Sequence, residues 1–201
     1  MGDLLLIRHG ETDWSLAGRH TGLTDQPLTP AGERRAASLA PLLARRRLKE
    51  VLCSPLRRAV RTAELALPSG AGVLLEADLR EWDYGGYEGM STEEVQRDVP
   101  GWDLWRDGVP PGDARHPGEG LADVAERCDR VLARVEGALR GDDGDVVLVA
   151  HAHVLRVLTA RRLGQDPAAG ALYRLDTGTL STLGREHGRW VIAGWNAEGG
   201  W

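Results

Sequence analysis

Two short segments of the chain place a histidine at the end of an apolar run. Leu4–Ile7 leads into Arg8 and His9, and Val146–Ala150 leads into His151. An imidazole can act as a nucleophile, and a guanidinium group presents donors that match the oxygens of a phosphate. These residue types favour chemistry on a phosphoryl group, in which fixed cationic donors stabilise the transferred charge.

Arg58 follows a third apolar run, Val51–Cys53. Ser54 and Pro55 fit the N-cap and the first position of a helix, and apolar residues then recur at spacings of three and four. We therefore expect Arg58 in the first turn of that helix, close to the end of a strand. Taken alone, Arg58 is better explained as an exposed surface arginine.

The apolar runs predict an α/β fold with a mostly parallel, mixed central sheet. Continuous apolar runs are typical of parallel strands that helices cover on both faces, and such sheets carry their sites at the carboxyl ends of the strands. The last two runs flank a glycine-bounded turn at 184–188, which favours a hairpin. The expected strands are Leu4–Arg8, Val51–Cys53, Val73–Glu76, Val146–Ala150, Leu180–Leu183 and Trp190–Ala193.

Composition indicates one domain, 1–201, with a sizeable core. The chain has 201 residues, 42% of them hydrophobic, and a formal net charge of −5. An acidic balance without a basic stripe argues against a nucleic-acid partner. No apolar run approaches the ~20 residues of a membrane span and no leader is recognisable, so we expect a cytoplasmic protein without a membrane partner. Cys53 and Cys128 are expected to be reduced.

A stretch rich in glycine and proline at 100–120 is expected to be irregular. Long irregular segments of compact domains are usually functional or mobile, so we interpret 84–120 as a lid or rim over the site. The stretch also contains Trp102 and Trp105. We expect at least one of these side chains to pack the rim onto the body of the domain.

Several motifs, taken in order, resemble the histidine phosphatase superfamily, also called the phosphoglycerate mutase-like family. The matching segments cover most of the chain and include Leu6–Thr12, Gly22–Thr29, Ser54–Ala59, Leu79–Gly85 and Ala150–His151. The resemblance implies a three-layer α/β/α sandwich and a phosphohistidine intermediate. The segments Trp14–Leu28 and Glu81–Gly89 are similar to the branch that includes sedoheptulose-bisphosphatase-like and acid-phosphatase-like members.

The resemblance also implies roles for individual residues. His9 is the expected nucleophile, and Glu81 is the expected acid that protonates the departing alcohol. Arg8, Arg58 and His151 are the expected phosphate pocket. The candidates for binding the rest of the substrate are Ser15, His20, Thr21, Tyr84 and His153, together with Arg61 and Tyr87.

Two positions depart from the common pattern of the family. Ser15 stands where many members have asparagine, and its hydroxyl reaches less far than an amide. Ala152 stands where many members have glycine after the second histidine. Alanine is tolerated there if the backbone is helical, and it is unfavourable if the position needs a positive φ.

Three functions fit these residues. The first is hydrolysis of a small phosphomonoester by a metal-independent phosphatase, with a sugar phosphate as a candidate substrate. The second is phosphoryl transfer by a cofactor-dependent phosphoglycerate mutase, and the third is phosphate binding without catalysis. A mutase must protect its phosphoenzyme from water, and only 195–201 follow the last expected strand, so we favour hydrolysis. The presence of every expected catalytic residue argues against a non-catalytic protein.

The spacing of His151 and His153 also occurs in metal sites. Arg8 and Arg58, aimed at the same pocket, would repel a divalent cation, so we expect neither a metal nor another cofactor. The expected partner is a small phosphorylated metabolite. The sequence leaves association into a homodimer open, because no uncovered apolar helix face demands a partner.

Overall fold

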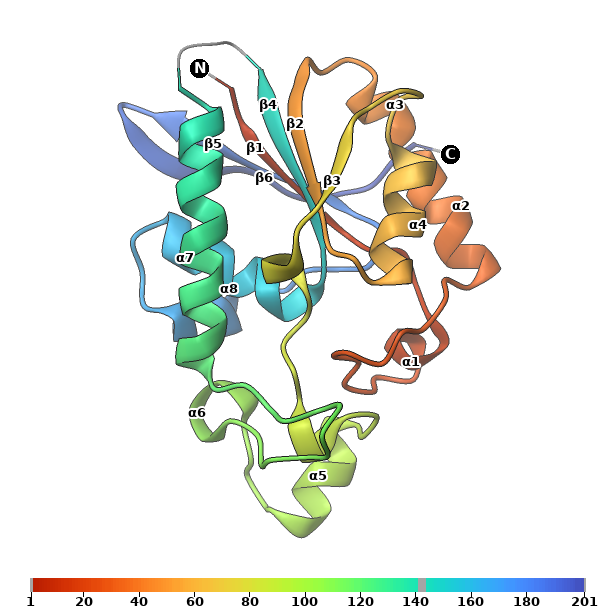
Figure 1. The fold of residues 1–201 in the computed structure, drawn as a ribbon, viewed down its shortest axis with the longest axis vertical. Coiled ribbons are helices and arrows are strands. Elements are labelled where there is room, and N and C mark those ends of the chain that lie inside the picture. The colour runs from red at the N-terminus through yellow and green to blue at the C-terminus, as the bar shows by residue number, and fades with distance from the viewer. Residues whose placement is uncertain (1, 141–143, 201) are drawn as a thin grey trace.

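The computed structural model describes residues 2–140 and 144–200, which form an α/β fold around one six-stranded sheet (Figure 1). The strands are β1 Leu4–Arg8, β2 Leu48–Cys53, β3 Val73–Leu75, β4 Asp145–Ala150, β5 Leu180–Glu186 and β6 Arg189–Ala197. In the spatial order β3-β2-β4-β1-β5-β6, the first four strands run parallel to one another. Strand β5 is antiparallel to both β1 and β6, which confirms the mostly parallel, mixed sheet.

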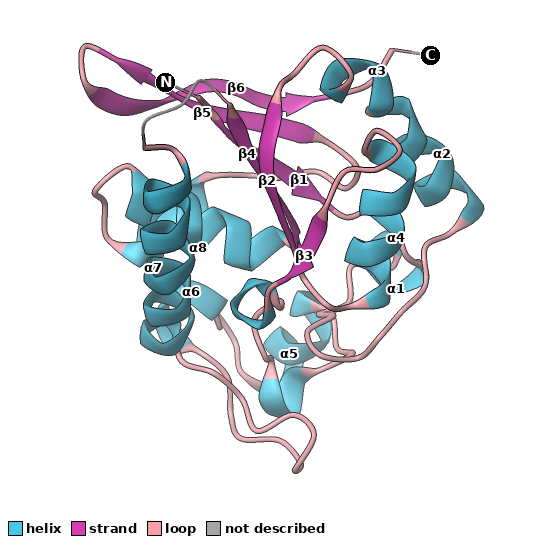
Figure 2. Cartoon of the chain, turned by 45° about the horizontal axis from the view of Figure 1, so that its top comes forward, coloured by secondary structure: helices cyan, strands magenta, loops and turns pink. Residues whose placement is uncertain are grey.

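Helices cover both faces of the sheet and give the expected three-layer α/β/α sandwich (Figure 2). One face carries α2 Pro30–Ser38, α3 Ala40–Leu43 and α4 Arg57–Ala66, and the other carries α7 Leu121–Ala138 and α8 Ala152–Arg162. The remaining short helices are α1 Asp13–Leu16, α5 Thr92–Asp98 and α6 Leu104–Asp107, with 3₁₀ turns at Ala77–Leu79, Gly85–Tyr87 and Pro167–Leu172. In Figure 1, α1, α5 and α6 lie below the sheet.

The alternation of side chains along the buried strands fills a core on each face of the sheet. Leu4 and Leu6 of β1 pack with residues of α7 and α8, whereas Leu5 and Ile7 pack with residues of α3 and α4. Successive side chains of a strand point to opposite faces, so one apolar run serves both cores. All four side chains are fully buried, and each burial stabilises the fold by about 1.5–3 kcal/mol.

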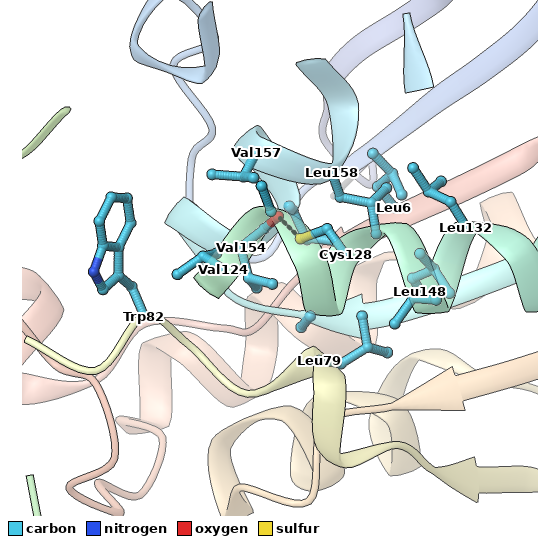
Figure 3. Close-up of a cluster of buried hydrophobic side chains, with 14 of the residues drawn as sticks. Leu6, Leu79, Trp82, Val124, Cys128, Leu132, Leu148, Val154, Val157 and Leu158 are labelled. Atoms are coloured by element: carbon cyan, nitrogen blue, oxygen red, sulfur yellow. Dashed lines mark hydrogen bonds between the residues drawn. The ribbon is translucent and has the colours of Figure 1, made fainter. Parts of the chain in front are cut away.

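Both cysteines belong to these cores and carry free thiols, as expected. Figure 3 shows Cys128 surrounded by leucine and valine side chains, with its thiol donating to the carbonyl oxygen of Val154. Burial raises the pKa of Cys53 and of Cys128 to about 12. Neither thiol is therefore poised to form the reactive thiolate.

The hairpin between β5 and β6 is tighter than the expected turn at 184–188. Glu186 pairs with Arg189, which leaves His187 and Gly188 as the turn, with φ values of 49° and 78°. Positive φ at both positions matches the type I′ turn, whose twist suits that of the flanking strands.

Strand β6 continues beyond the expected end at Ala193 to Ala197 and includes the first three residues expected as a tail after it. This strand lies at the edge of the sheet and is half exposed, so its sequence lacks the continuous apolar run that marks the central strands. Of the expected tail at 195–201, Trp201 lies outside the described residues.

The stretch 100–120, expected to be irregular from its glycine and proline content, contains the short helix α6, and α5 precedes it within the segment 84–120. Ser91 and Glu94 form a capping box at the start of α5, each side chain accepting from the backbone N–H of the other. The Asp103 side chain accepts from the N–H of Trp105 at the start of α6. These caps satisfy donors that a helix leaves unpaired in its first turn, so short helices form between the glycines.

The carboxyl ends of three parallel strands meet at one edge of the sheet. In the register of the sheet, Arg8 at the end of β1 lies opposite Ala150 at the end of β4, and Cys53 at the end of β2 lies opposite Val149. The backbone N–H of His9 donates to the carbonyl of Ala150 at 2.9 Å. The residues that follow these strands are thereby brought together.

None of the helices in the described ranges is both long enough and apolar enough to cross a membrane.

Candidate active site

The imidazole of His9 is held as a neutral ring with one free nitrogen. Its Nδ1 atom lies 2.7 Å from the carbonyl oxygen of Gly10, and a carbonyl can only accept, so Nδ1 carries the proton. Burial, followed by the charges of Arg58 and Arg8, holds the pKa of His9 well below its usual value of 6.5. Nε2 therefore keeps its lone pair at neutral pH, which is the state that a nucleophile requires.

Gly10 fixes the loop that carries His9. Its N–H donates to the hydroxyl of Thr62 on α4 at 2.9 Å, and a Cβ atom at Gly10 would lie 2.5 Å from the carbonyl oxygen of Gly32 on α2. Only glycine fits so close to another backbone. The loop after β1 is therefore clamped between two helices, which limits movement of the imidazole.

His151 lies beside His9, and Arg58 is hydrogen-bonded to His151. Arg58 Nε donates to His151 Nδ1 at 3.1 Å, so the proton of the His151 ring is on Nε2, which lies 2.7 Å from the Ser54 hydroxyl. Burial, followed by the charge of Arg58, holds the pKa of His151 well below its usual value. The centroids of the His9 and His151 rings are 5.1 Å apart.

The expected N-cap role of Ser54 is wrong. Helix α4 begins at Arg57 with Leu56 as its N-cap residue, and no side chain caps it. The Ser54 hydroxyl is instead engaged with His151, which satisfies a buried ring nitrogen. Arg58 nevertheless lies in the first turn of α4, as expected.

The remaining donors of Arg58 hold the loop before Asp25. Nη1 donates to the carbonyl of Thr24 at 3.0 Å, and Nη2 donates to those of Thr21 at 3.1 Å and Gly22 at 2.8 Å. Arg58 is fully buried, unlike its exposed neighbour Arg57. The guanidinium group thus places a fixed positive charge behind the His9 ring and anchors a wall of the site.

Arg8 offers donors that the protein leaves unpaired. One Nη1 hydrogen bonds to the carbonyl of Leu175, but the buried Nε has no partner among the described residues. A buried donor without a partner is costly, by roughly 1–3 kcal/mol, unless a ligand or water satisfies it. An anion beside Arg8 and His9 would satisfy this donor, and arginine presents its donors in the geometry that phosphate matches.

Glu81 is held over the site by the start of α8. Its carboxylate accepts from the backbone N–H groups of Trp82 at 2.9 Å, His153 at 3.0 Å and Val154 at 2.9 Å. The first-turn N–H groups of a helix lack partners within the helix, and the dipole favours a negative group there. Ala152 is the first residue of α8, so alanine meets no strain at a position where many family members have glycine.

A cleft of about 340 Å³ opens onto His9. Arg8, His9 and Glu81 line its inner end. The other expected site residues that line it are Ser15, His20, Thr21, Tyr84 and His153. Arg58 and His151 are not among the lining residues, because both are fully buried behind His9.

Two candidates for substrate binding lie elsewhere, so these expectations are wrong. Arg61 pairs with Glu33 and Glu64 on the outer surface of the helix layer. Tyr87 packs edge-on against Trp102, with the ring centroids 5.2 Å apart, and does not line the cleft. The alternative interpretation of Arg61, as a solvated arginine beside Arg58, fits its exposed side chain.

The outer half of the cleft, which lies away from Arg8, His9 and Glu81, holds side chains that stay uncharged at neutral pH. The Tyr84 hydroxyl lies 2.6 Å from Nδ1 of His153, and burial raises the pKa of Tyr84 well above its usual value. Burial also lowers the pKa of His20 to about 4 and that of His153 well below 6.5. The Ser15 hydroxyl is engaged with the backbone of Thr12 in the capping box of α1.

Several residues of the cleft escaped the sequence reasoning. Both Trp102 and Trp105 line the cleft in addition to packing against the core, as the packing hypothesis predicted. The lining residues without an earlier assignment are Gly18, Arg19, Thr92, Gln96, Asp103, Leu104 and Ala152. The sequence signals that were missed are the helix caps Ser91 and Asp103, which would have placed α5 and α6 within the segment 84–120.

Comparison with known proteins confirms the resemblance. A family model described as the histidine phosphatase superfamily (branch 1) matches residues 4–198. An acid phosphatase of Mycobacterium tuberculosis is 38% identical over 188 residues, covering 92% of this chain and 87% of that protein. A glucosyl-3-phosphoglycerate phosphatase of Mycolicibacterium vanbaalenii is 34% identical over 217 residues, covering 97% and 94%.

Among solved structures, that of an open reading frame from Mycobacterium tuberculosis matches with a TM-score of 0.89 at 36% identity, covering 99% of each chain. The fold, the order of the motifs and the full-length sequence match agree with one another. The chain therefore belongs to branch 1 of the histidine phosphatase superfamily.

Proposed function

We propose that this protein is a phosphatase that hydrolyses small phosphomonoesters through a phosphohistidine at His9, without a metal ion. The observation that carries the proposal is the free Nε2 of a neutral imidazole beside a partnerless arginine donor, Arg8 Nε, at the inner end of one cleft. Relatives that match nearly the whole chain are named as phosphatases, which supports the same reaction type.

In the first step, the lone pair on Nε2 of His9 attacks the phosphorus atom of the ester. The bond from phosphorus to the alcohol oxygen breaks, and Glu81 in its protonated form gives its proton to that oxygen. Arg8 stabilises the charge on the equatorial oxygens of the transferred group, and the buried charge of Arg58 acts from behind His9. The products are a phosphohistidine and a free alcohol.

In the second step, a water molecule attacks the phosphohistidine. The Glu81 carboxylate takes a proton from the water, the nitrogen–phosphorus bond breaks, and inorganic phosphate leaves. His9 regains its lone pair and Glu81 regains its proton, so the cycle closes. His151, whose Nδ1 accepts from Arg58 and whose Nε2 is engaged with Ser54, is proposed to hold the Arg58 guanidinium in place in both steps.

The engagement of the two neighbouring histidines supports a reaction without a metal. Both ring nitrogens of His151 are hydrogen-bonded, to Arg58 and Ser54, and Nδ1 of His153 is hydrogen-bonded to the Tyr84 hydroxyl. A metal at these rings would have to displace those partners in the presence of a buried guanidinium charge.

Hydrolysis is favoured over a mutase reaction by the placement of the C-terminal residues. The described residues after Gly194 do not line the cleft, and Glu198 pairs with Arg35 on α2. They therefore do not shield the phosphohistidine from water.

We propose that 84–120 forms the rim of the cleft within a single domain, and that the substrate is a phosphorylated metabolite of the cytoplasm.

The test is release of inorganic phosphate from a panel of aryl, sugar, glycerate and nucleotide phosphates in EDTA. Wild type is compared with His9→Ala and with His187→Asn, which changes an exposed turn histidine and tolerates the positive φ there. Turnover by wild type and His187→Asn, lost in His9→Ala, supports the proposal. Activity that EDTA abolishes and a metal restores would overturn the metal-independent mechanism, and isomer interconversion without release would favour the mutase.

A further inference from the structure

Five aromatic rings line the part of the cleft that lies away from Arg8, His9 and Glu81. The His20 ring lies over Tyr84 with centroids 4.8 Å apart, and meets Trp102 edge-on at 5.5 Å. The cluster continues from Tyr84 to His153, with ring centroids 5.7 Å apart, and from His153 to Trp105, with centroids 5.4 Å apart. All five rings line the same cleft, so a ligand that extends outward from His9 contacts this cluster.

The polar side chains of this outer half already have partners within the protein. The Thr21 hydroxyl donates to the carbonyl of Arg19, the Gln96 amide donates to the carbonyl of Trp102, and the Ser15 hydroxyl donates to the carbonyl of Thr12. The hydroxyl of Tyr84 is likewise engaged with His153. A sugar would bring several hydroxyl groups into this space, and these would have to share groups that are already partly engaged within the protein.

The charges of the outer half do not form a second anion site. Its two charged side chains are of opposite sign: Arg19, which donates to the carbonyl of Gly89, and Asp103, which accepts from the N–H of Trp105. The two histidines stay neutral at physiological pH, because burial lowers the pKa of His20 to about 4 and that of His153 well below 6.5. Binding a phosphate dianion takes several converging donors, which this half of the cleft lacks.

We propose that the preferred substrate is a phosphate monoester whose alcohol carries one aromatic ring and no second anionic group. This rests on the proposed function and names the substrate class of the same cleft. The cleft of about 340 Å³ lies at the small end of ligand pockets, which span roughly 300–1,000 Å³, so it fits a phosphate and one ring system. The aromatic walls favour stacked and edge-to-face contacts with such a ring.

The experiment measures kcat/KM in EDTA for four esters of primary alcohols: benzyl phosphate, propyl phosphate, glucose 6-phosphate and fructose 1,6-bisphosphate. We expect benzyl phosphate to exceed each of the others by about tenfold, the order of magnitude that one good aromatic contact provides. Equal or faster turnover of the sugar monophosphate or of the bisphosphate would overturn the proposal.

Trp105→Leu is the variant that tests the wall directly. It should reduce the ratio of kcat/KM for benzyl phosphate to that for propyl phosphate. Trp190→Leu is the matched control, because Trp190 lies on β6 between Arg162 and Arg185 and does not line the cleft. Its ratio should equal that of the wild type. An unchanged ratio in a folded Trp105→Leu variant would contradict the assignment.

Binding of phosphonates to the wild-type protein gives a test that depends neither on the folding of a variant nor on turnover. Calorimetry should give a Kd for benzylphosphonate about tenfold lower than for propylphosphonate. Equal dissociation constants would overturn the ring preference even if every ester were hydrolysed. If no ester is hydrolysed but benzylphosphonate binds more tightly, the proposed catalysis fails and the ligand class stands.

Discussion

The carbonyl oxygen of Gly10 lies 2.7 Å from Nδ1 of His9, and this contact decides which nitrogen of the ring can react. A proton on Nδ1 leaves the lone pair on Nε2, toward the cleft that Arg8 and Glu81 also line. The backbone of the residue after the nucleophile thus sets its tautomer. The contact needs no second side chain to orient the ring, unlike the carboxylate of a Ser-His-Asp triad.

Glu81→Gln should slow formation of the phosphohistidine by about 10²–10⁴-fold for esters of alkyl alcohols, because glutamine cannot protonate the leaving oxygen. The leaving oxygen of an acidic phenol needs little protonation, so the rate of this step should fall much less for esters of such phenols. Single-turnover kinetics with an alkyl and a dinitrophenyl phosphate separate the two cases. An equal loss for both esters would show that Glu81 acts by positioning and not as an acid.

Acid should destabilise the protein through its buried histidines. The pKa of His20 is about 4 in the folded state, and those of His9, His151 and His153 lie well below 6.5. Below pH 6.5 the unfolded chain binds protons that the folded chain excludes, so stability falls as the pH drops from 6.5 toward 4. Above pH 6.5 these groups contribute no pH dependence. Each histidine removes up to about 1.4 kcal/mol per pH unit in that window.

Urea unfolding at pH 7.5, 6 and 5 measures this dependence. His20→Gln should lose less stability between pH 6 and pH 5 than the wild type, because one of the excluded protons is no longer involved. His187→Asn, which changes an exposed histidine, is the control. A pH dependence identical in wild type and His20→Gln would contradict the assignment of His20 as a half-buried ring that stays neutral.

Arg127→Met should destabilise the fold by about 3 kcal/mol, since it leaves Glu119 without its partner. Arg127 is buried; Nε and Nη2 bind the Glu119 carboxylate, and Nη1 donates to the carbonyls of Asp78 and Arg80. These bonds hold the segment that carries Glu81, so activity should fall as well.

Arg130→Met is the matched control on the same helix. Arg130 also pairs with Asp78, but its side chain is 54% exposed, and exposed pairs contribute about 0–1 kcal/mol. Urea midpoints at constant m value compare the two variants. Equal losses would show that burial of the Arg127 pair is not what stabilises this segment.

Asn196 is predicted to position Arg8 from the far end of the chain. Its backbone has a φ of 54°, and its side chain accepts from the N–H of Asp176 and donates to the carbonyl of Arg174. Between these two residues, the Leu175 carbonyl accepts from Arg8. Losing the Asn196 amide should loosen this loop and raise the KM for phosphate esters several-fold more than it lowers kcat.

Two substitutions separate the hydrogen bonds from the backbone strain. Asn196→Gly removes the side chain and keeps the positive φ at no steric cost, whereas Asn196→Ala adds about 1–2 kcal/mol of strain. Both variants should raise KM alike, and only Asn196→Ala should lose this additional stability in urea. Wild-type KM in both variants would show that the loop does not position Arg8.

The central strands and the histidines at their ends were predictable because burial on both faces leaves a clear apolar run. His9 and His151 follow such runs directly, so their meeting at one edge of the sheet followed from the fold class. The length of β6 was underestimated because an edge strand buries too little surface to require a continuous apolar run.

Contacts between distant segments were beyond the reach of local patterns. Ser54 fits an N-cap by sequence, and only the packing of β2 beside β4 shows that its hydroxyl belongs to His151. Likewise Arg58 and Arg61 stand on the same helix, yet one is fully buried behind His9 and the other pairs with surface acids. The face of the helix on which each side chain lies decides its role. The presence of several arginines near the start of the helix does not specify that face.

The most direct test is to trap the phosphoenzyme. Wild type and His9→Ala are mixed with an aryl phosphate, quenched within the first turnover in base, in which phosphohistidine survives, and analysed by intact mass and peptide mapping. We predict that wild type gains one phosphoryl group, located on His9 and lost in acid, and that His9→Ala gains none. A phosphoryl group on another residue, or hydrolysis by His9→Ala at the wild-type rate, would contradict the mechanism.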